Sequence, residues 1–388
     1  MKIASRIDKL SPSITLSITA LANELKAQGK DILSFSAGEP DFDTPQIIKD
    51  EAIKAITNGK TKYTAVEGIK ELKQAIVNKL KRDHNLEYSL DGIVVSNGAK
   101  HSLFNLTQAL IDEGDEVIIP SPYWVTYPEL VIYSGGVPVF IETDESCEFK
   151  ISAKQLKDAI TPKTKILMLN SPSNPTGSIY TKEELLAIGE VLKGTDIIVL
   201  SDEMYEKLNY KGKKFTASAE VSSDMYNRTI TINGLSKSVA MTGWRFGYFA
   251  TADKKLAKAV SKLQGQATSN INSMTQYAAI VALDGKADKD IEAMRMEFER
   301  RKDYAVKAIN DIKNLSCYDP DGAFYLFVNI KDFSNDSMKF CADLLEQKGV
   351  ALVPGLAFGM EGYVRLSFAT SMEAIIDGIN RIKEFVEN

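Results

Sequence analysis

Seven short apolar runs in the middle of the sequence most constrain how this chain can fold. Several are almost continuously apolar, as strands buried on both faces of a sheet are. Helical patterns separate most of them, which predicts βαβ units and an α/β fold with a seven-stranded, mainly parallel sheet flanked by helices. The predicted strands are Ile93–Ser96, Glu116–Pro120, Val137–Glu142, Lys165–Asn170, Asp196–Ser201, Thr229–Asn233 and Phe246–Ala250.

The two ends of the chain have a different character. A long charged helix is predicted over Asp288–Asn310, and strands over Ala323–Ile330 and Val364–Phe368 follow it. Residues before about Pro45 lack the parallel-sheet pattern, so we expect them to join this C-terminal part in a smaller α+β domain. The expected domains are residues 46–285 for the large one, and residues 1–45 with 286–388 for the small one.

Composition excludes several classes of function. The net charge of −5 gives no basic surface for nucleic acid. Three widely spaced cysteines argue against a disulfide framework and fit a reducing, cytoplasmic compartment. The N-terminus carries charges where a signal peptide needs an apolar run, and no stretch approaches the ~18 apolar residues that span a membrane. With only His84 and His101, a multi-histidine zinc site cannot be built.

Polar residues follow several of the predicted strands. Asp202 closes the fifth strand and Lys237 follows the sixth, while Asn174 follows the fourth and Tyr205 lies just after Asp202. A lysine amine can condense with an aldehyde, and an aspartate can keep a pyridine nitrogen protonated so that the ring acts as an electron sink. Each residue alone has an ordinary interpretation as a turn or surface residue. Their joint occurrence at strand ends favours a site for pyridoxal phosphate.

The same edge of the sheet receives three more candidates. Gly98 and Lys100 follow the first predicted strand, and Trp124 follows the second. Because ligands of open α/β sheets bind outside the carboxyl ends of the strands, we expect these groups to converge on one site.

Several ordered motifs resemble the class I aminotransferases of the fold type I pyridoxal-phosphate superfamily, most closely a bacterial subgroup of aspartate and aspartate/prephenate aminotransferases. The resemblance covers nearly the whole chain. The matching segments are Ser36–Pro45, Gly59–Tyr63, Ser121–Trp124, Asn170–Gly177, Ser201–Tyr205, Ser236–Lys237, Met241–Arg245 and Val364–Phe368.

The resemblance implies roles around the cofactor ring. Lys237 would bind pyridoxal phosphate covalently and later move the Cα proton of the substrate. Asp202 would pair with the ring nitrogen, and Asn174 and Tyr205 would donate to the phenolic oxygen. Trp124 would stack on the ring, although a buried core aromatic is an equally ordinary interpretation.

The resemblance also implies a phosphate site. Three backbone N–H groups at a helix N-terminus would hold the anion, because the helix dipole favours negative charge there. Arg245 would add positive charge, and Tyr63 would reach in from the second subunit of a homodimer. Whether Ser236 contacts the phosphate stays open. The three backbone residues are Gly98, Ala99 and Lys100.

For the substrate, the resemblance implies that Arg365 grips the α-carboxylate as a bidentate fork and that the backbone of Gly38 completes the pocket, beside Trp124 and Asn174. A surface salt bridge is the ordinary alternative for Arg365.

A dicarboxylic substrate has a second, distal carboxylate, which needs a cation of its own. No arginine occurs between Phe246 and Met294, where a related subgroup supplies one. The resemblance assigns this task to Lys100, Ser13 and Thr15, and the alternative for the two hydroxyls is capping of the following helix.

The implied activity is transfer of the amino group of L-aspartate to 2-oxoglutarate, giving oxaloacetate and L-glutamate by a ping-pong mechanism. The scaffold does not separate this from a broad-specificity, aromatic or prephenate aminotransferase, or from a C–S lyase. A non-catalytic, ligand-sensing domain of a regulator is a third possibility, and the intact lysine disfavours it.

Overall fold

A computed structural model describes residues 3–388, and its largest feature is a seven-stranded sheet in the order β2-β8-β7-β6-β5-β3-β4. Each of the seven predicted strands is present in it, so the predicted α/β fold is confirmed. The strands are β2 (Ile93–Ser96), β3 (Glu116–Ser121), β4 (Val137–Glu142), β5 (Thr164–Asn170), β6 (Ile198–Asp202), β7 (Thr229–Gly234) and β8 (Gly247–Ala250).

One strand breaks the parallel pattern. β8 is antiparallel to both of its neighbours, β2 and β7, while the remaining neighbours pair in parallel. The carboxyl ends of β2, β3, β5, β6 and β7 therefore open at one edge. β6 extends one residue beyond its predicted end, because Asp202 pairs in register with Asn170 on one side and Ile232 on the other.

Helices cover both faces of this sheet, as the apolar strands require. Alternate strand residues such as Val94 and Val95 belong to apolar clusters on opposite faces. A capping box formed by Thr181 and Glu184 begins α8. One face carries α5 (Ala99–Leu110), α6 (Thr126–Tyr133) and α10 (Lys254–Ala267); the other carries α4 (Lys70–His84), α7 (Ala153–Ala159), α8 (Lys182–Leu192), α9 (Ser223–Arg228) and α11 (Ser273–Leu283), with α3 (Gln46–Thr57) against α11.

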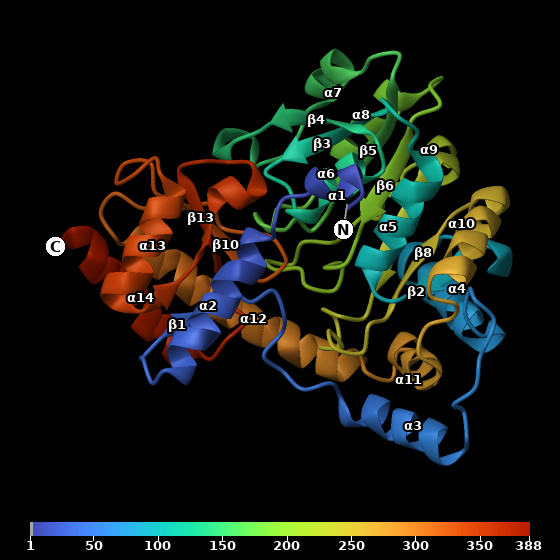
Figure 1. The fold of residues 1–388 in the computed structure, drawn as a ribbon, viewed down its shortest axis with the longest axis horizontal. Coiled ribbons are helices and arrows are strands. Elements are labelled where there is room, and N and C mark those ends of the chain that lie inside the picture. Colours follow the sequence, from blue (N-terminus) through green and yellow to red (C-terminus); the bar gives the residue numbers. More distant parts are fainter. Residues whose placement is uncertain (1–2) are drawn as a thin grey trace.

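A second group of elements surrounds a four-stranded antiparallel sheet in the order β12-β13-β10-β9 (Figure 1). The short strand β1 (Leu33–Ser34) pairs in parallel with β11 (Val350–Ala351), which joins N-terminal residues to this C-terminal part. The expected domain boundaries stay a prediction. The remaining elements are α1 (Ser5–Asp8), α2 (Ile14–Ala27), α12 (Asp288–Asn310), β9 (Ser316–Cys317), β10 (Tyr325–Asn329), α13 (Ser337–Lys348), β12 (Val353–Pro354), β13 (Tyr363–Ser367) and α14 (Met372–Glu387).

Among the described residues, no helix combines the length and the apolar character needed to cross a membrane.

Candidate active site

The carboxyl-end edge of the large sheet borders a cavity of about 450 Å³. Residues from the small antiparallel sheet and from the N-terminal helix α2 close its other sides. Two residues from the expected site do not line it: Tyr63 is 91% exposed, and Gly98 lies behind Arg245. The expected residues that line the cavity are Ser13, Thr15, Gly38, Ala99, Lys100, Trp124, Asn174, Asp202, Tyr205, Ser236, Lys237, Arg245 and Arg365.

Lys237 projects into this cavity from the segment after β7. Its Nζ donates a hydrogen bond to the carbonyl of Gly38 and lies 5.9 Å from the centre of the Tyr205 ring. Burial lowers the pKa of Lys237 to about 8, against the opposing attraction of Glu39. A sizeable fraction of the amine is therefore neutral near pH 7 to 8, as a nucleophile or proton acceptor must be.

Asp202, at the end of β6, is 6% exposed. Its Oδ2 accepts a hydrogen bond from the hydroxyl of Tyr127 at 2.8 Å, and its Oδ1 accepts one from the N–H of Met204 at 3.3 Å. Burial raises the pKa of Asp202 to about 6, although the hydrogen bond from Tyr127 opposes this. A protonated ring nitrogen beside the carboxylate would favour its charged form, so the site fits that partner.

Arg365 is a buried cation whose hydrogen-bond partners are neutral. It lies on β13, is 2% exposed, and donates to Asn174 Oδ1 at 3.0 Å and to the carbonyl of Ser36 at 2.9 Å. Its Nε is buried and has no partner within residues 3–388. Burial lowers the pKa of Arg365. A buried guanidinium without a counter-charge is costly unless an anion binds it, and a carboxylate matches its fork.

The N-terminus of α5 forms a second cationic end of the cavity. Gly98 caps this helix with φ 86°, and a Cβ there would lie 2.4 Å from Nη2 of Arg245. The N–H of Gly98 already donates to the carbonyl of Ser96 at 2.7 Å, so the amides of Ala99 and Lys100 are the donors that remain. Burial, with Arg245 adding to it, lowers the pKa of Lys100. The two free amides and the guanidinium of Arg245 at this helix N-terminus fit a phosphate group.

The Tyr205 hydroxyl and the side-chain oxygen of Asn174, both expected around the ring, already have partners within the chain. Tyr205 and Tyr325 share a hydrogen bond of 2.8 Å between their hydroxyls, and Asn174 accepts from Arg365. Near the distal end, Ser13 Oγ accepts from the N–H of Leu16 at 3.4 Å and caps α2, which is the alternative expected for it. Thr15 Oγ1 is buried and has no partner within residues 3–388.

The sequence did not point to several polar residues of this cavity. Tyr127 donates to Asp202, and its position three residues after Trp124 at the start of α6 was an available signal. Tyr325 lies in an apolar strand and gave no signal. Asn170, Glu39 and Thr242 lie in matching segments but received no role; Asn170 donates to the carbonyl of Asp202, and Thr242 donates to Glu39 at 2.8 Å.

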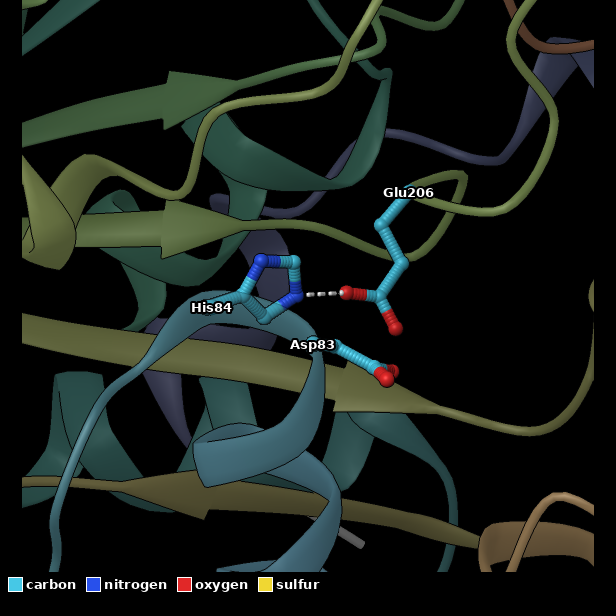
Figure 2. A group of neighbouring side chains, drawn as sticks. All are labelled: Asp83, His84 and Glu206. Carbon is cyan, nitrogen blue, oxygen red and sulfur yellow. Dashed lines mark hydrogen bonds and ion pairs between the residues drawn. The ribbon is translucent and has the colours of Figure 1, made fainter.

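A second polar cluster lies behind the turn that follows β6, on the other side from the cavity. Figure 2 shows the ring of His84, at the end of α4, hydrogen-bonded to Glu206 at 2.6 Å with the carboxylate of Asp83 beside it. Such atoms could ligate a metal ion. However, Lys79 Nζ is bonded to Glu206 and Lys207 Nζ lies 2.8 Å from Asp83, so lysines already neutralise both carboxylates. The cluster is therefore a network of ion pairs.

Comparisons with known proteins agree with this geometry. The family model for aminotransferase class I and II matches residues 30–382. The chain is 50% identical to an aspartate aminotransferase of Bacillus subtilis (strain 168), over 100% of this chain and 99% of the relative. It is 47% identical to an aspartate/prephenate aminotransferase of Nitrosomonas europaea, over 98% of this chain and 99% of the relative.

Solved structures give the same assignment. The aspartate aminotransferase of Thermus thermophilus with maleate superposes with a TM-score of 0.95 at 39% identity, covering 99% of both chains. That of Rhizobium meliloti has a TM-score of 0.96 at 42% identity, covering 100% of this chain and 99% of the other. The fold is that of a class I or II aminotransferase. The chain belongs to this family, and the predicted resemblance is confirmed.

Proposed function

We propose that this protein transfers the amino group of L-aspartate to 2-oxoglutarate with pyridoxal phosphate as its cofactor. The observation that carries the proposal is the placement of Lys237, Asp202 and Arg365 around one cavity. The relatives named aspartate aminotransferase support the same substrate.

The residues that would hold the cofactor divide between its two ends. Asp202 would accept a hydrogen bond from the ring nitrogen, and Asn174 and Tyr205 would donate to the phenolic oxygen. Trp124 would pack against the ring. The amides of Ala99 and Lys100, with Arg245, would bind the phosphate. When bound, pyridoxal phosphate supplies a ring that accepts the electrons released when the Cα–H bond of the substrate breaks.

The chain's own residues then perform binding and proton transfer. Arg365 orients the substrate through its α-carboxylate, which holds the Cα–H bond beside Lys237. With its pKa lowered to about 8, Lys237 takes the Cα proton onto Nζ and delivers it elsewhere on the reacting molecule. Asp202 and Arg365 are 6% and 2% exposed, so water screens their charges only weakly.

The preference for an acidic substrate depends on the far end of the cavity. Lys100 Nζ lies 4.9 Å from the centre of the Trp124 ring, and both residues line the cavity, so Lys100 is available to a second carboxylate of the substrate. Thr15 offers a buried hydroxyl, whereas that of Ser13 already caps α2. Amino transfer to prephenate is the second candidate, because one of the relatives is named for both substrates.

The exposed Tyr63 supports an assembly with shared sites. It is 91% exposed beside α3, where Ile53 and Ile56 are 59% and 55% exposed. Apolar side chains gathered on one surface are typical of a subunit interface. We therefore propose that the protein forms a homodimer in the cytoplasm. Sedimentation at assay concentration tests the dimer: a fully active monomer would contradict it.

Borohydride reduction of the cofactor-loaded protein, followed by peptide mapping, tests the central assignment. The label is expected on Lys237, and a label on Lys100 would contradict the site. Turnover of aspartate against tyrosine, prephenate and cystathionine as alternative substrates then separates the proposed reaction from its competitors on the same scaffold.

A further inference from the structure

Tyr325 touches three parts of the cavity at once. Its hydroxyl lies 2.8 Å from the hydroxyl of Tyr205, and the guanidinium of Arg365 lies 4.3 Å from the centre of its ring. On a third side, a Cβ added to Gly38 would lie 3.1 Å from the Tyr325 hydroxyl. The side chain is 1% exposed and lines the cavity. Tyr325 therefore links Tyr205, the expected partner of the phenolic oxygen, to Arg365, the expected partner of the substrate α-carboxylate.

The hydrogen bond between the two tyrosines has a direction that matters. A phenol hydroxyl carries one proton and can donate only one hydrogen bond. If the hydroxyl of Tyr205 donates its hydrogen bond to Tyr325, it has no proton left to donate to a ligand in the cavity. If Tyr325 is the donor, the proton of Tyr205 stays available for a ligand.

Charges around the pair favour Tyr325 as the donor. The cation of Arg365 lies over the ring of Tyr325 and stabilises negative charge developing on that phenol. The charge of Arg365 also acts on Tyr205, but there the carboxylate of Asp202 opposes it and makes the Tyr205 oxygen the better acceptor. Two hydrogen bonds in series also strengthen each other, so a donor behind Tyr205 improves Tyr205 as a donor.

We propose that Tyr325 is a positioning residue: it donates to Tyr205 and so directs the proton of Tyr205 to the phenolic oxygen of the cofactor. This inference rests on the proposed function, because it assumes that pyridoxal phosphate binds at Lys237 and Tyr205.

The test is the pH titration of the absorbance of the bound cofactor in the absence of substrate. A donor to the phenolic oxygen withdraws electron density, which makes the nitrogen joining Lys237 to the cofactor more acidic. Tyr325→Phe keeps the ring under Arg365 and removes only the hydroxyl. The titration midpoint should rise by roughly 0.3 to 1 pH unit, the scale of one hydrogen bond.

Three further variants make the test specific. Tyr205→Phe should raise the midpoint at least as far, and adding Tyr325→Phe to it should raise the midpoint no further, because Tyr325 acts through Tyr205. Tyr210→Phe is the matched control: it removes another buried hydroxyl of the same apolar cluster, which donates to the carbonyl of Ala323 away from the cavity. It should leave the midpoint unchanged.

Incorporation of 3-fluorotyrosine at position 325 keeps the test decisive if Tyr325→Phe does not fold. The fluorine makes the hydroxyl a stronger donor with little change of shape, so the midpoint should fall. If the titration midpoint of Tyr325→Phe or of the fluorotyrosine variant equals that of the parent, the inference is overturned. An additive rise in the Tyr205→Phe/Tyr325→Phe double variant also overturns it. Weakened succinate binding in Tyr325→Phe with an unchanged midpoint would show action through Arg365 alone, which also overturns it.

Failure of the proposed function would look different. A parent protein with no titrating cofactor band, or with no borohydride label on Lys237, would overturn both proposals. A parent that titrates and labels normally, with a silent Tyr325→Phe, would overturn only this inference.

Discussion

The two polar clusters on either side of the turn after β6 have similar residues and opposite character. In the cavity, Arg365 and Lys237 bond to neutral groups, and the carboxylate of Asp202 accepts from a phenol and a backbone amide. Behind the turn, Glu206 has both Lys79 and His84 as partners.

Volume does not separate the two regions. The hollow beside Asp83, His84 and Glu206 measures about 540 Å³, slightly more than the 450 Å³ of the cavity at Lys237. What differs is that the second cluster satisfies its own charges and the first does not. Buried charges without a partner of opposite charge reduce stability, and they indicate where a ligand supplies the missing partner.

The largest expected effect is that of Lys237→Ala. Loss of the amine removes both covalent attachment and proton transfer, so kcat/KM should fall by about 10⁴-fold or more. Because the substitution removes a partly buried amine whose hydrogen-bond partner is a neutral carbonyl, the unfolding temperature of the cofactor-free protein should stay the same or rise. Steady-state kinetics and thermal unfolding measure the two effects. A loss of both activity and stability would erase the contrast between the clusters.

Glu206→Gln should show the reverse of Lys237→Ala, namely a loss of stability with activity nearly unchanged. It leaves Lys79 and His84 without their shared carboxylate, and breaking a buried ion pair costs about 3–5 kcal/mol of unfolding free energy. Glu87→Gln is the control, since its pair with Lys81 is exposed and screened by water, so that its loss should change stability little. Denaturant unfolding measures the difference. At 25 °C the folded Glu206→Gln enzyme should keep activity within a few-fold of the parent, and a much larger loss would make Glu206 part of the active site.

Arg365 and Lys100 sharpen the comparison within the cavity. Arg365→Ala should cost roughly 2–5 kcal/mol in kcat/KM for aspartate and for alanine or phenylalanine alike, because every amino acid has an α-carboxylate. Lys100→Ala should affect aspartate and glutamate and leave neutral amino acids much less changed. Its effect should be smaller, because an ammonium is a flexible point charge. Equal losses for both substrate classes would show that Lys100 serves the cofactor or the fold.

Asp202→Asn changes the charge with little change of shape. An amide cannot stabilise a protonated ring nitrogen electrostatically, so activity should fall by roughly 100-fold or more, the scale of one lost electrostatic group. Near-parental thermal unfolding would show that the fold is intact. Amino transfer within a few-fold of the parent would mean that Asp202 is not the partner of the ring.

The sequence predicted the large sheet well, because strands buried on both faces leave uninterrupted apolar runs such as Ile166–Leu169. It also located Asp202 and Lys237, because their place at strand ends in a parallel sheet defines where they meet. Arg365 came from motif resemblance alone, since it lies on an antiparallel strand of the second sheet.

Residues that act through tertiary contacts were not predictable. Tyr325 sits in an aromatic, apolar strand where every neighbour is a core residue, and only the fold brings its hydroxyl to Tyr205. Lys79 and His84 belong to the charged end of a helix, which in a sequence is typical of a solvated surface. Their burial follows from the packing of α4 against the turn that carries Glu206.

The smallest expected effect is a pH dependence that belongs to the second cluster alone. Burial tends to lower the pKa of His84, but hydrogen bonds to Glu206 and Glu220 raise it to about 9 from 6.5. Because the folded-state pKa lies above the unfolded one, the stabilisation is complete below about pH 6.5 and is lost as the pH rises through 9. This shift corresponds to at most about 3 kcal/mol.

Other groups titrate in neighbouring windows, so the measurement must isolate His84. Burial raises the pKa of Glu203 to about 7, so this group makes the folded protein less stable as the pH rises from 4.5 to 7. Burial lowers that of Lys237 to about 8, which raises the stability of the cofactor-free protein above pH 8. Subtracting the unfolding free energy of His84→Gln from that of the parent at each pH largely cancels these contributions. The difference should shrink steadily from pH 7 to 9.5, while the Lys237→Ala variant should retain the same His84-dependent decline. A difference independent of pH would mean that His84 is neutral in the folded protein, and the cluster would then hold one cation fewer than its geometry indicates.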